Sequence, residues 1–274
     1  MLKEIIENVR KTCPLIHNIT NYVTVNDCAN ILLACGASPI MADDVQEAED
    51  ITAICGGLNI NIGTLNQRTI PAMNIAGKKA NELGHPIVLD PVGVGASELR
   101  TKTARELMEH VRFTVIRGNI SEIKTLAQGN GSTRGVDADI TDAVTKEDLP
   151  QVVAFAKEFA KKTGAVIAIT GAIDIVADDK KAYCIFNGHP MMSSITGTGC
   201  QLSAITAAYV TANKDNPLEA VAAAVCVMGI CGEMAYSRLT KEDGNATYRN
   251  YIIDAVYRLD GDELEKNAKY EIYE

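Results

Sequence analysis

Short apolar runs alternate with amphipathic helical stretches along the chain, and this alternation is the feature that most constrains its fold. The runs that predict strands are 38–41, 58–62, 86–90, 113–117, 165–170, 175–177 and 182–186. The stretches that predict helices are 2–11, 24–35, 45–54, 68–83, 98–110, 121–127, 147–162, 200–212, 216–238 and 247–258. Continuous apolar strands separated by helices indicate a parallel sheet covered on both faces.

We therefore expect an α/β protein with a doubly wound, mostly parallel sheet. The turn residues Asp178-Asp179-Lys180 lie between two strand-like runs and predict a hairpin, so part of the sheet is expected to be antiparallel. The sequence has no evident linker, repeat or low-complexity segment, which favours a single domain over residues 1–274.

Composition narrows the classes of function. A net charge of −9 argues against non-specific nucleic-acid binding, which needs a basic surface. Acidic residues begin at Glu4, too early for a signal peptide, and we expect no membrane span and a cytoplasmic protein. The eight cysteines lack C-x-x-C spacing, so a zinc site is not expected and most of them are interpreted as buried thiols.

The segment Ser194–Cys200, SITGTGC, precedes a predicted helix that is rich in small residues. Exposed backbone N–H groups and the helix dipole make such a position suitable for an anion, most often a phosphate. Gly197 and Gly199 would let the backbone approach a ligand closely, and Cys200 stands where the dipole lowers the pKa of a thiol. The alternative is a glycine turn that only lets the helix pack closely on the sheet.

Polar residues follow several predicted strands, and ligands collect at the carboxyl ends of strands in such sheets. Asp90 and Glu122 together suit Mg²⁺, which binds through one or two carboxylates and substrate phosphates. Asp90 before Pro91 is alternatively a turn former, and Glu122 is alternatively part of a helix cap with Asn119 or Ser121.

Arg117 and Thr170 also end apolar strands. Arg117 either forms an internal salt bridge or contacts a nucleotide phosphate, and Thr170 is either a plain strand end or a hydroxyl that faces phosphate. The segment Pro14–Tyr22 is dense in polar side chains, and His17 and Asn18 either form a buried network or line a small-molecule pocket.

Taken together, PLIHNITNYVTVN, GASPIMA, LNINIGTL, LDPVGVGAS, VIRGNISEI, ITG and NGHPMMSSITGTGC resemble hydroxyethylthiazole kinase, a thiamine-salvage family of the ribokinase-like superfamily. The matching segments run in order from Pro14 to about Ala207. The sequence departs from the family pattern at Gly244–Tyr248, where the family often has a GPGSF-like turn.

The resemblance implies ATP- and Mg²⁺-dependent phosphorylation of 4-methyl-5-(2-hydroxyethyl)thiazole by a homotrimer with active sites between neighbouring subunits. It implies that Met41 and Gly197 contact the thiazole, with Asn18 in a segment that reaches the shared site. It also implies that Arg117 and Thr170 contact the ATP phosphates beside Gly199, and that Asp90 and Glu122 hold Mg²⁺ largely through water. Cys200 falls where other kinases of the superfamily place an aspartate base.

Three other functions are compatible with this type of fold. One is a nucleotide-dependent dehydratase of hydrated nicotinamide nucleotides, which favours aspartate where this chain has Cys200. Another is a non-catalytic thiazole or nucleotide sensor, which has no need of a base. The third is a vitamin kinase acting on pyridoxal or hydroxymethylpyrimidine, which only the shape of the pocket would distinguish.

Overall fold

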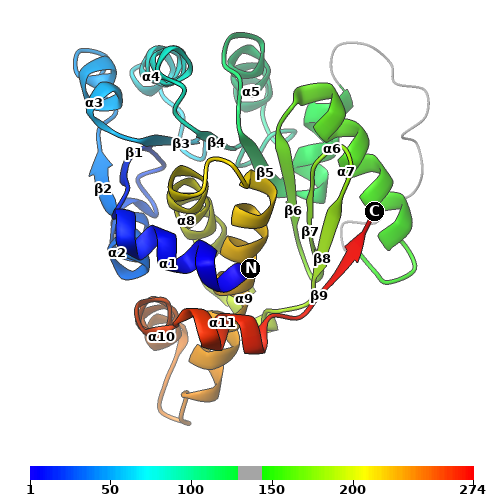
Figure 1. Ribbon diagram of the computed structural model, residues 1–274. Coiled ribbons are helices and arrows are strands. Elements are labelled where there is room, and N and C mark those ends of the chain that lie inside the picture. The colour runs from blue at the N-terminus through cyan, green and yellow to red at the C-terminus, as the bar shows by residue number, and fades with distance from the viewer. Residues whose placement is uncertain (129–143) are drawn as a thin grey trace.

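A nine-stranded sheet runs through the protein, and helices pack on both of its faces (Figure 1). The structure is a computed structural model that describes residues 1–128 and 144–274. The strands in chain order are β1 (Leu15–Ile19), β2 (Ser38–Met41), β3 (Gly57–Asn61), β4 (Ile87–Asp90), β5 (Val115–Asn119), β6 (Val166–Thr170), β7 (Asp174–Ala177), β8 (Ala182–Ile185) and β9 (Tyr270–Tyr273).

The strand order is β2-β1-β3-β4-β5-β6-β7-β8-β9. The first six strands in this order are parallel to their neighbours, and the pairings from β6 onward are antiparallel. The doubly wound, mostly parallel sheet is thus confirmed, as is the hairpin between β7 and β8. Two strands, β1 and β9, were not predicted from the sequence.

The helices are α1 (Leu2–Thr12), α2 (Val25–Cys35), α3 (Ala48–Ile54), α4 (Thr69–Leu83), α5 (Glu98–His110), α6 (Ile120–Gln128), α7 (Leu149–Thr163), α8 (Thr198–Ala212), α9 (Pro217–Ser237), α10 (Asn245–Arg258) and α11 (Gly261–Asn267), with the 3₁₀ helix η1 (Pro190–Ser194). Each of the ten predicted helices is present. The short η1 and α11 were not predicted.

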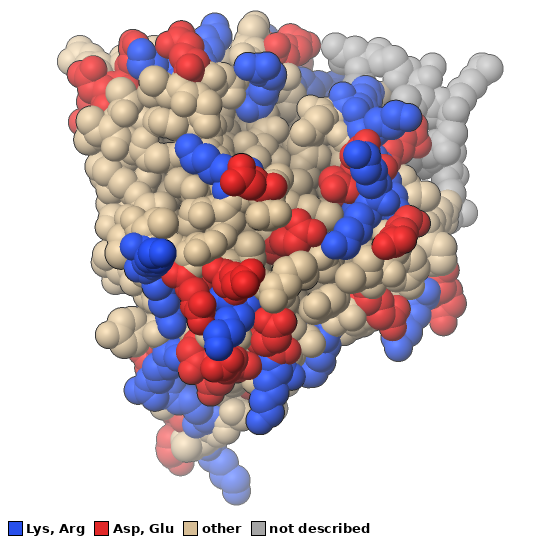
Figure 2. Space-filling view, viewed as in Figure 1, with Lys and Arg blue, Asp and Glu red and all other residues tan. Residues whose placement is uncertain are grey.

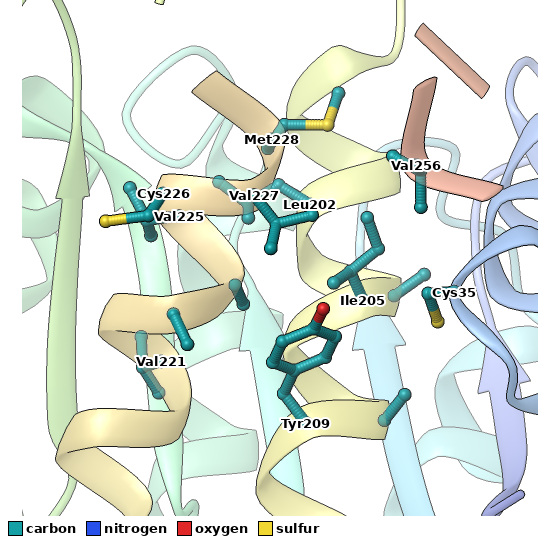
Figure 3. Close-up of a cluster of buried hydrophobic side chains, with 14 of the residues drawn as sticks. Cys35, Leu202, Ile205, Tyr209, Val221, Val225, Cys226, Val227, Met228 and Val256 are labelled. Carbon is teal, nitrogen blue, oxygen red and sulfur yellow. The ribbon is translucent and has the colours of Figure 1, made fainter. Parts of the chain in front are cut away.

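Two apolar cores lie on opposite faces of the sheet. Side chains of α1, α2, α8, α9, α10 and α11 form the core on one face, and side chains of α3 to α7 form the core on the other. The helix pair α8 and α9 is the centre of the first core, where Ile205, Tyr209, Val221 and Val225 are buried together (Figure 3).

Helix α9 is long and apolar enough to cross a membrane, unlike any other helix in the described part of the chain. The sequence therefore contains an apolar run of this length, although no membrane span was expected. Within the protein, 83% of its apolar window is buried. Its apolar character follows from its position, because it packs against α8 on one side and α10 on another. We therefore interpret α9 as a core helix.

The first helix is clamped to the last two helices by polar contacts. Lys3 forms an ion pair with Asp262, with Nζ 2.7 Å from Oδ1. Arg10 Nη2 donates to the carbonyl of Leu259 at 2.6 Å and to those of Tyr257 and Val256 at 3.3 and 3.4 Å. Basic and acidic side chains are intermixed over this part of the surface (Figure 2). Arg10 thereby satisfies carbonyl groups that the end of α10 leaves without helical partners.

Replacing Arg10 with methionine should lower the free energy of unfolding by about 2 kcal/mol, because it removes a charged donor and keeps the apolar stem. The measurement is a urea titration followed by circular dichroism. The matched control is Lys11→Met on the exposed side of the same helix, which should leave the midpoint unchanged. Equal midpoints for the two variants would contradict the capping role.

Candidate active site

A cluster of polar side chains lies where three neighbouring parallel strands end. Asp90 is the last residue of β4, Arg117 lies in β5, and Thr170 is the last residue of β6. Because these strands are adjacent and parallel, their carboxyl ends lie along the same edge of the sheet. Helix α8 begins at this edge and brings Gly199 and Cys200 to the same cluster. The predicted position of the site is thus where the side chains converge.

Asp90 is completely buried, and three side chains donate to its Oδ2 atom. The donors are Asn61 Nδ2 at 2.8 Å, Ser203 Oγ at 2.8 Å and Arg117 Nη1 at 3.3 Å. Burial raises the pKa of Asp90, and the guanidinium and the two neutral donors oppose that rise. The other oxygen, Oδ1, is buried with no partner among the described residues, so it remains available to a ligand.

Arg117 connects the ends of the three strands. Its Nη1 atom pairs with Asp90, and its Nη2 atom donates to Thr170 Oγ1 at 2.7 Å. The side chain is only 11% exposed, and it also borders an open cavity. The salt bridge that the sequence offered as one interpretation is therefore present. It leaves part of the guanidinium facing the cavity, as a phosphate contact requires.

The two glycines at the start of α8 are held close to other side chains. Gly197 has φ = 89°, a left-handed conformation, and a Cβ atom there would collide with Cγ2 of Thr24. A Cβ atom on Gly199 would lie 2.6 Å from Nη2 and 2.7 Å from Nη1 of Arg117. Gly197 therefore needs glycine for its backbone conformation, whereas a side chain at Gly199 would displace Arg117, a side chain of the candidate site.

Cys200 is half buried, and its sulfur accepts hydrogen bonds from Asn21 Nδ2 at 3.2 Å and Asn61 Nδ2 at 3.3 Å. The pKa of this thiol is nevertheless raised rather than lowered. Burial raises the pKa of Cys200, and the negative charge of Asp90 adds to the rise. Hydrogen bonds from Thr24 and Asn21 and the charge of Arg117 oppose it.

Glu122 has the role of a helix cap. Asn119 Oδ1 accepts from the Glu122 amide at 2.8 Å, and Glu122 Oε2 accepts from the Asn119 amide at 2.9 Å. This reciprocal pair is a capping box at the start of α6. The other oxygen, Oε1, accepts from the Gly93 amide at 2.8 Å, which ties the loop after β4 to α6. Each carboxylate oxygen retains a lone pair, so the cap leaves room for a water-mediated metal contact.

A cavity of about 530 Å³ opens beside Arg117 and Thr170. Its walls come from the ends of β6 and β8, from η1, and from α8 and α9, with Gly199, Leu202, Val225 and Met228 among the lining residues. The lining also includes Asp174, whose pKa is raised to about 7 by burial. A cavity of this size, apolar on one side and cationic at one end, suits a nucleotide.

His17, Asn18 and Met41 lie apart from these contacts, on β1 and β2. Asn18 is 1% exposed and bonds to the Ile16 carbonyl and to Asn59. His17 is completely buried between Thr52 and the Ala42 carbonyl, and burial lowers its pKa. Both residues therefore take part in a buried hydrogen-bond network. Met41 is half buried at the end of β2 and packs against the first core.

Sequence reasoning assigned no role to three residues that complete the cluster: Asn21, Asn61 and Ser203. A usable signal existed for Ser203, because it follows Cys200 by three residues and thus shares a face of α8. In the described part of the chain, no group of three His, Cys, Asp or Glu side chains is placed to hold a metal ion. Any Mg²⁺ here would therefore depend on water and substrate phosphates for most of its ligands.

Comparison with known proteins gives a consistent result. The family described as "Hydroxyethylthiazole kinase family" matches residues 6–262. A protein of Clostridium acetobutylicum named hydroxyethylthiazole kinase is 70% identical over 273 residues, a match that covers 100% of each chain. The structure of a hydroxyethylthiazole kinase from Pyrococcus horikoshii OT3 is 34% identical, with a TM-score of 0.88 over 100% of this chain and 99% of that one. A ribokinase-like superfamily protein of Enterococcus faecalis V583 shares the fold at 12% identity, with a TM-score of 0.63 over 93% of both chains.

Proposed function

The chain belongs to the hydroxyethylthiazole kinase family, a family of phosphotransferases, and on this premise we propose that it phosphorylates the hydroxyl of 4-methyl-5-(2-hydroxyethyl)thiazole with ATP. The reaction would serve thiamine salvage in the cytoplasm, with the whole chain acting as one kinase domain. The observation that carries the proposal is the contact of Arg117 with Asp90, Thr170 and the start of α8 at the mouth of a nucleotide-sized cavity.

Positioning and charge neutralisation account for most of the catalysis of phosphoryl transfer. The nucleotide would lie in the cavity with its phosphates toward Arg117 and Thr170. The first amides of α8, from Gly197 to Cys200, would stabilise charge on the transferred group, since these N–H groups have no partner within the helix. One such preorganised donor typically contributes about 3–4 kcal/mol. Cys200 would accept the proton of the thiazole alcohol, and Met41 and Gly197 would contact the thiazole.

Magnesium fits the residues present. The buried Oδ1 atom of Asp90 has no partner among the described residues, and the Glu122 oxygens retain acceptor capacity. These two carboxylates would hold the ion largely through water. The positive charge of the ion would offset the negative charge of the triphosphate.

Replacing Glu122 with glutamine should have two effects. The free energy of unfolding should fall by about 1 kcal/mol, because the capping carboxylate is lost. The Mg²⁺ concentration for half-maximal rate should also rise severalfold, as it should for Asp90→Asn. The matched control is Asp260→Asn, since Asp260 caps α11 by accepting from the Glu263 amide at 2.8 Å. If the Mg²⁺ concentration for half-maximal rate is unchanged in Glu122→Gln, as it should be in Asp260→Asn, then Glu122 acts only as a helix cap.

A coupled assay of ADP release tests the proposed reaction. The thiazole alcohol should support ADP release with ATP and Mg²⁺, and pyridoxal and hydroxymethylpyrimidine should support much less. Hydrated NADH tests the dehydratase alternative in the same protein sample. If the protein converts hydrated NADH but forms no ADP from ATP in the presence of the thiazole alcohol, the dehydratase function replaces the proposal. If it binds nucleotide but converts none of the substrates, the sensor function is favoured.

We also propose that the active protein is a homotrimer. The supporting observation is the loop before α2, where Tyr22 is 75% exposed and Val23 is 57% exposed, next to Thr24, which packs against Gly197. Exposed apolar side chains beside a site suit coverage by a second subunit. Light scattering should give three times the chain mass, and Tyr22→Asp should reduce both the assembly and the activity. A monomer of full activity would contradict this.

A further inference from the structure

Two buried asparagines meet the sulfur of Cys200 from two different segments. Asn21 lies in the loop between β1 and α2, and Asn61 is the last residue of β3. Their Nδ2 atoms lie 3.2 and 3.3 Å from Cys200 Sγ, and both donate to it. Asn21 is 4% exposed and Asn61 is 1% exposed, so solvent competes little for these amides.

Every hydrogen of the two amide groups has an assigned acceptor. Asn61 Nδ2 donates to Asp90 Oδ2 at 2.8 Å as well as to the sulfur. Asn21 Nδ2 donates to Asn61 Oδ1 at 3.0 Å as well as to the sulfur. Since each amide group carries two hydrogens, neither has one left over.

The amide oxygens are also occupied, which fixes the orientation of both side chains. Asn61 Oδ1 accepts from the Gly63 amide at 2.9 Å in addition to Asn21. Asn21 Oδ1 accepts from the amide and the hydroxyl of Thr24, both at 3.1 Å. Turning the Asn61 amide over would place its oxygen against the carboxylate of Asp90. The network therefore selects the orientation in which both nitrogen atoms face the sulfur.

Two donors directed at one sulfur favour the state in which that sulfur accepts hydrogen bonds. They oppose the burial and the negative charge of Asp90, which favour the protonated thiol. They also fix the sulfur relative to Asp90, because Asn61 bonds to both groups. Neither asparagine needs to touch the substrate for this effect.

We propose that Asn21 and Asn61 are positioning residues for Cys200, which hold its sulfur as an acceptor and tie it to Asp90. The inference rests on the proposed function, because it gives these amides a purpose only if Cys200 takes a proton during phosphoryl transfer. Its physical content, two amides that act on one thiol, can be measured without any substrate.

The test is the alkylation rate of Cys200 by iodoacetamide at pH 8, followed by peptide mass spectrometry. Cys13, which is exposed and remote, serves as the reference within each molecule. Asn61→Leu keeps a similar volume and removes the donors, and it should slow Cys200 alkylation about tenfold relative to Cys13, because bonds to a charged acceptor have about this effect. The matched control is Asn59→Leu. Asn59 is also buried and lies on the same face of β3 as Asn61, but it bonds to Asn18 instead of to the sulfur. This control should leave the ratio unchanged.

A second variant, Asn21→Asp, allows the same alkylation measurement if Asn61→Leu does not fold. Asn21→Asp retains the oxygen that accepts from Thr24 and loses the donors to the sulfur, so it should also slow alkylation. Both variants should lower kcat for the thiazole alcohol with little change in its KM.

An unchanged or increased alkylation ratio in the folded variants would overturn the inference. Slower alkylation with an unchanged kcat would show that the positioning of Cys200 by the two asparagines does not matter for phosphoryl transfer, and would overturn that part of the inference. Failure of the proposed function would show separately, as a wild-type protein that does not phosphorylate the thiazole alcohol.

Discussion

Replacing Gly199 with valine should lower the rate of phosphoryl transfer by about 10²–10³-fold or more while the protein stays folded. A side chain at this position meets the guanidinium of Arg117, with the new Cβ atom only 2.6 Å from Nη2. The end of a long side chain moves at small cost in stability, so Arg117 gives way. It then loses its contacts with Thr170 and Asp90, and the added side chain also blocks access to the first amides of α8.

Single-turnover phosphorylation by Gly199→Val, compared with its thermal midpoint, measures the two effects separately. Gly244→Ala is the matched control for activity, because no atom lies within 4 Å of the Cβ position there. Gly229→Ala is the contrast for stability, because its Cβ atom would lie 2.8 Å from backbone atoms of Asn187. A Gly199→Val protein with near-normal turnover would refute the anion-site interpretation and leave only the packing turn.

Replacing Cys200 with serine should slow the chemical step by about 10²–10⁴-fold, the usual contribution of a general base, with much less effect on thiazole binding. A serine hydroxyl does not ionise in the accessible pH range. Cys200→Asp should retain substantial activity, because a carboxyl group has a much lower intrinsic pKa than a thiol and can take the same role of base. Cys13→Ser is the control for loss of a thiol far from the site.

The pH dependence of the wild-type rate gives a further check on the base. Because burial raises the pKa of Cys200, the thiolate is the minor form at pH 7 and its fraction increases with pH. The single-turnover rate should therefore rise from pH 7 toward pH 9 in the wild type and stay nearly flat in Cys200→Asp. Equal rates for wild type, Ser and Asp variants at every pH would show that the amides and the charged groups suffice without a base.

The sheet and its helices could be predicted because their sequence patterns are local. Seven of the strands are apolar runs, and every long helix has its own hydrophobic face or apolar composition. Strand β1 escaped this reasoning because two of its five residues, His17 and Asn18, are polar. Their buried partners, Thr52, Ala42 and Asn59, come from other segments that only the fold brings close.

The same distinction applies to the site. Asp90, Arg117 and Thr170 could be identified because each lies at or near the carboxyl end of an apolar strand, and neighbouring parallel strands end at the same edge of the sheet. The bonds of Asn61 and Ser203 to Asp90 depend on how α8 lies against β3 and β4, although the spacing of Ser203 from Cys200 already places both on one face of α8. The raised pKa of Cys200 has the same origin, since it results from burial and from a carboxylate 110 positions earlier in the sequence.

The clamp between the first helix and the last two constrains how the chain folds as it leaves the ribosome. Arg10 finds its carbonyl acceptors in Leu259 and the end of α10, and Lys3 finds Asp262. At about 5–20 residues per second, roughly 12–50 seconds of synthesis separate Arg10 from Leu259. During that interval the apolar face of α1 lacks its final partners. Completion of this side of the protein must therefore await synthesis of α10 and α11.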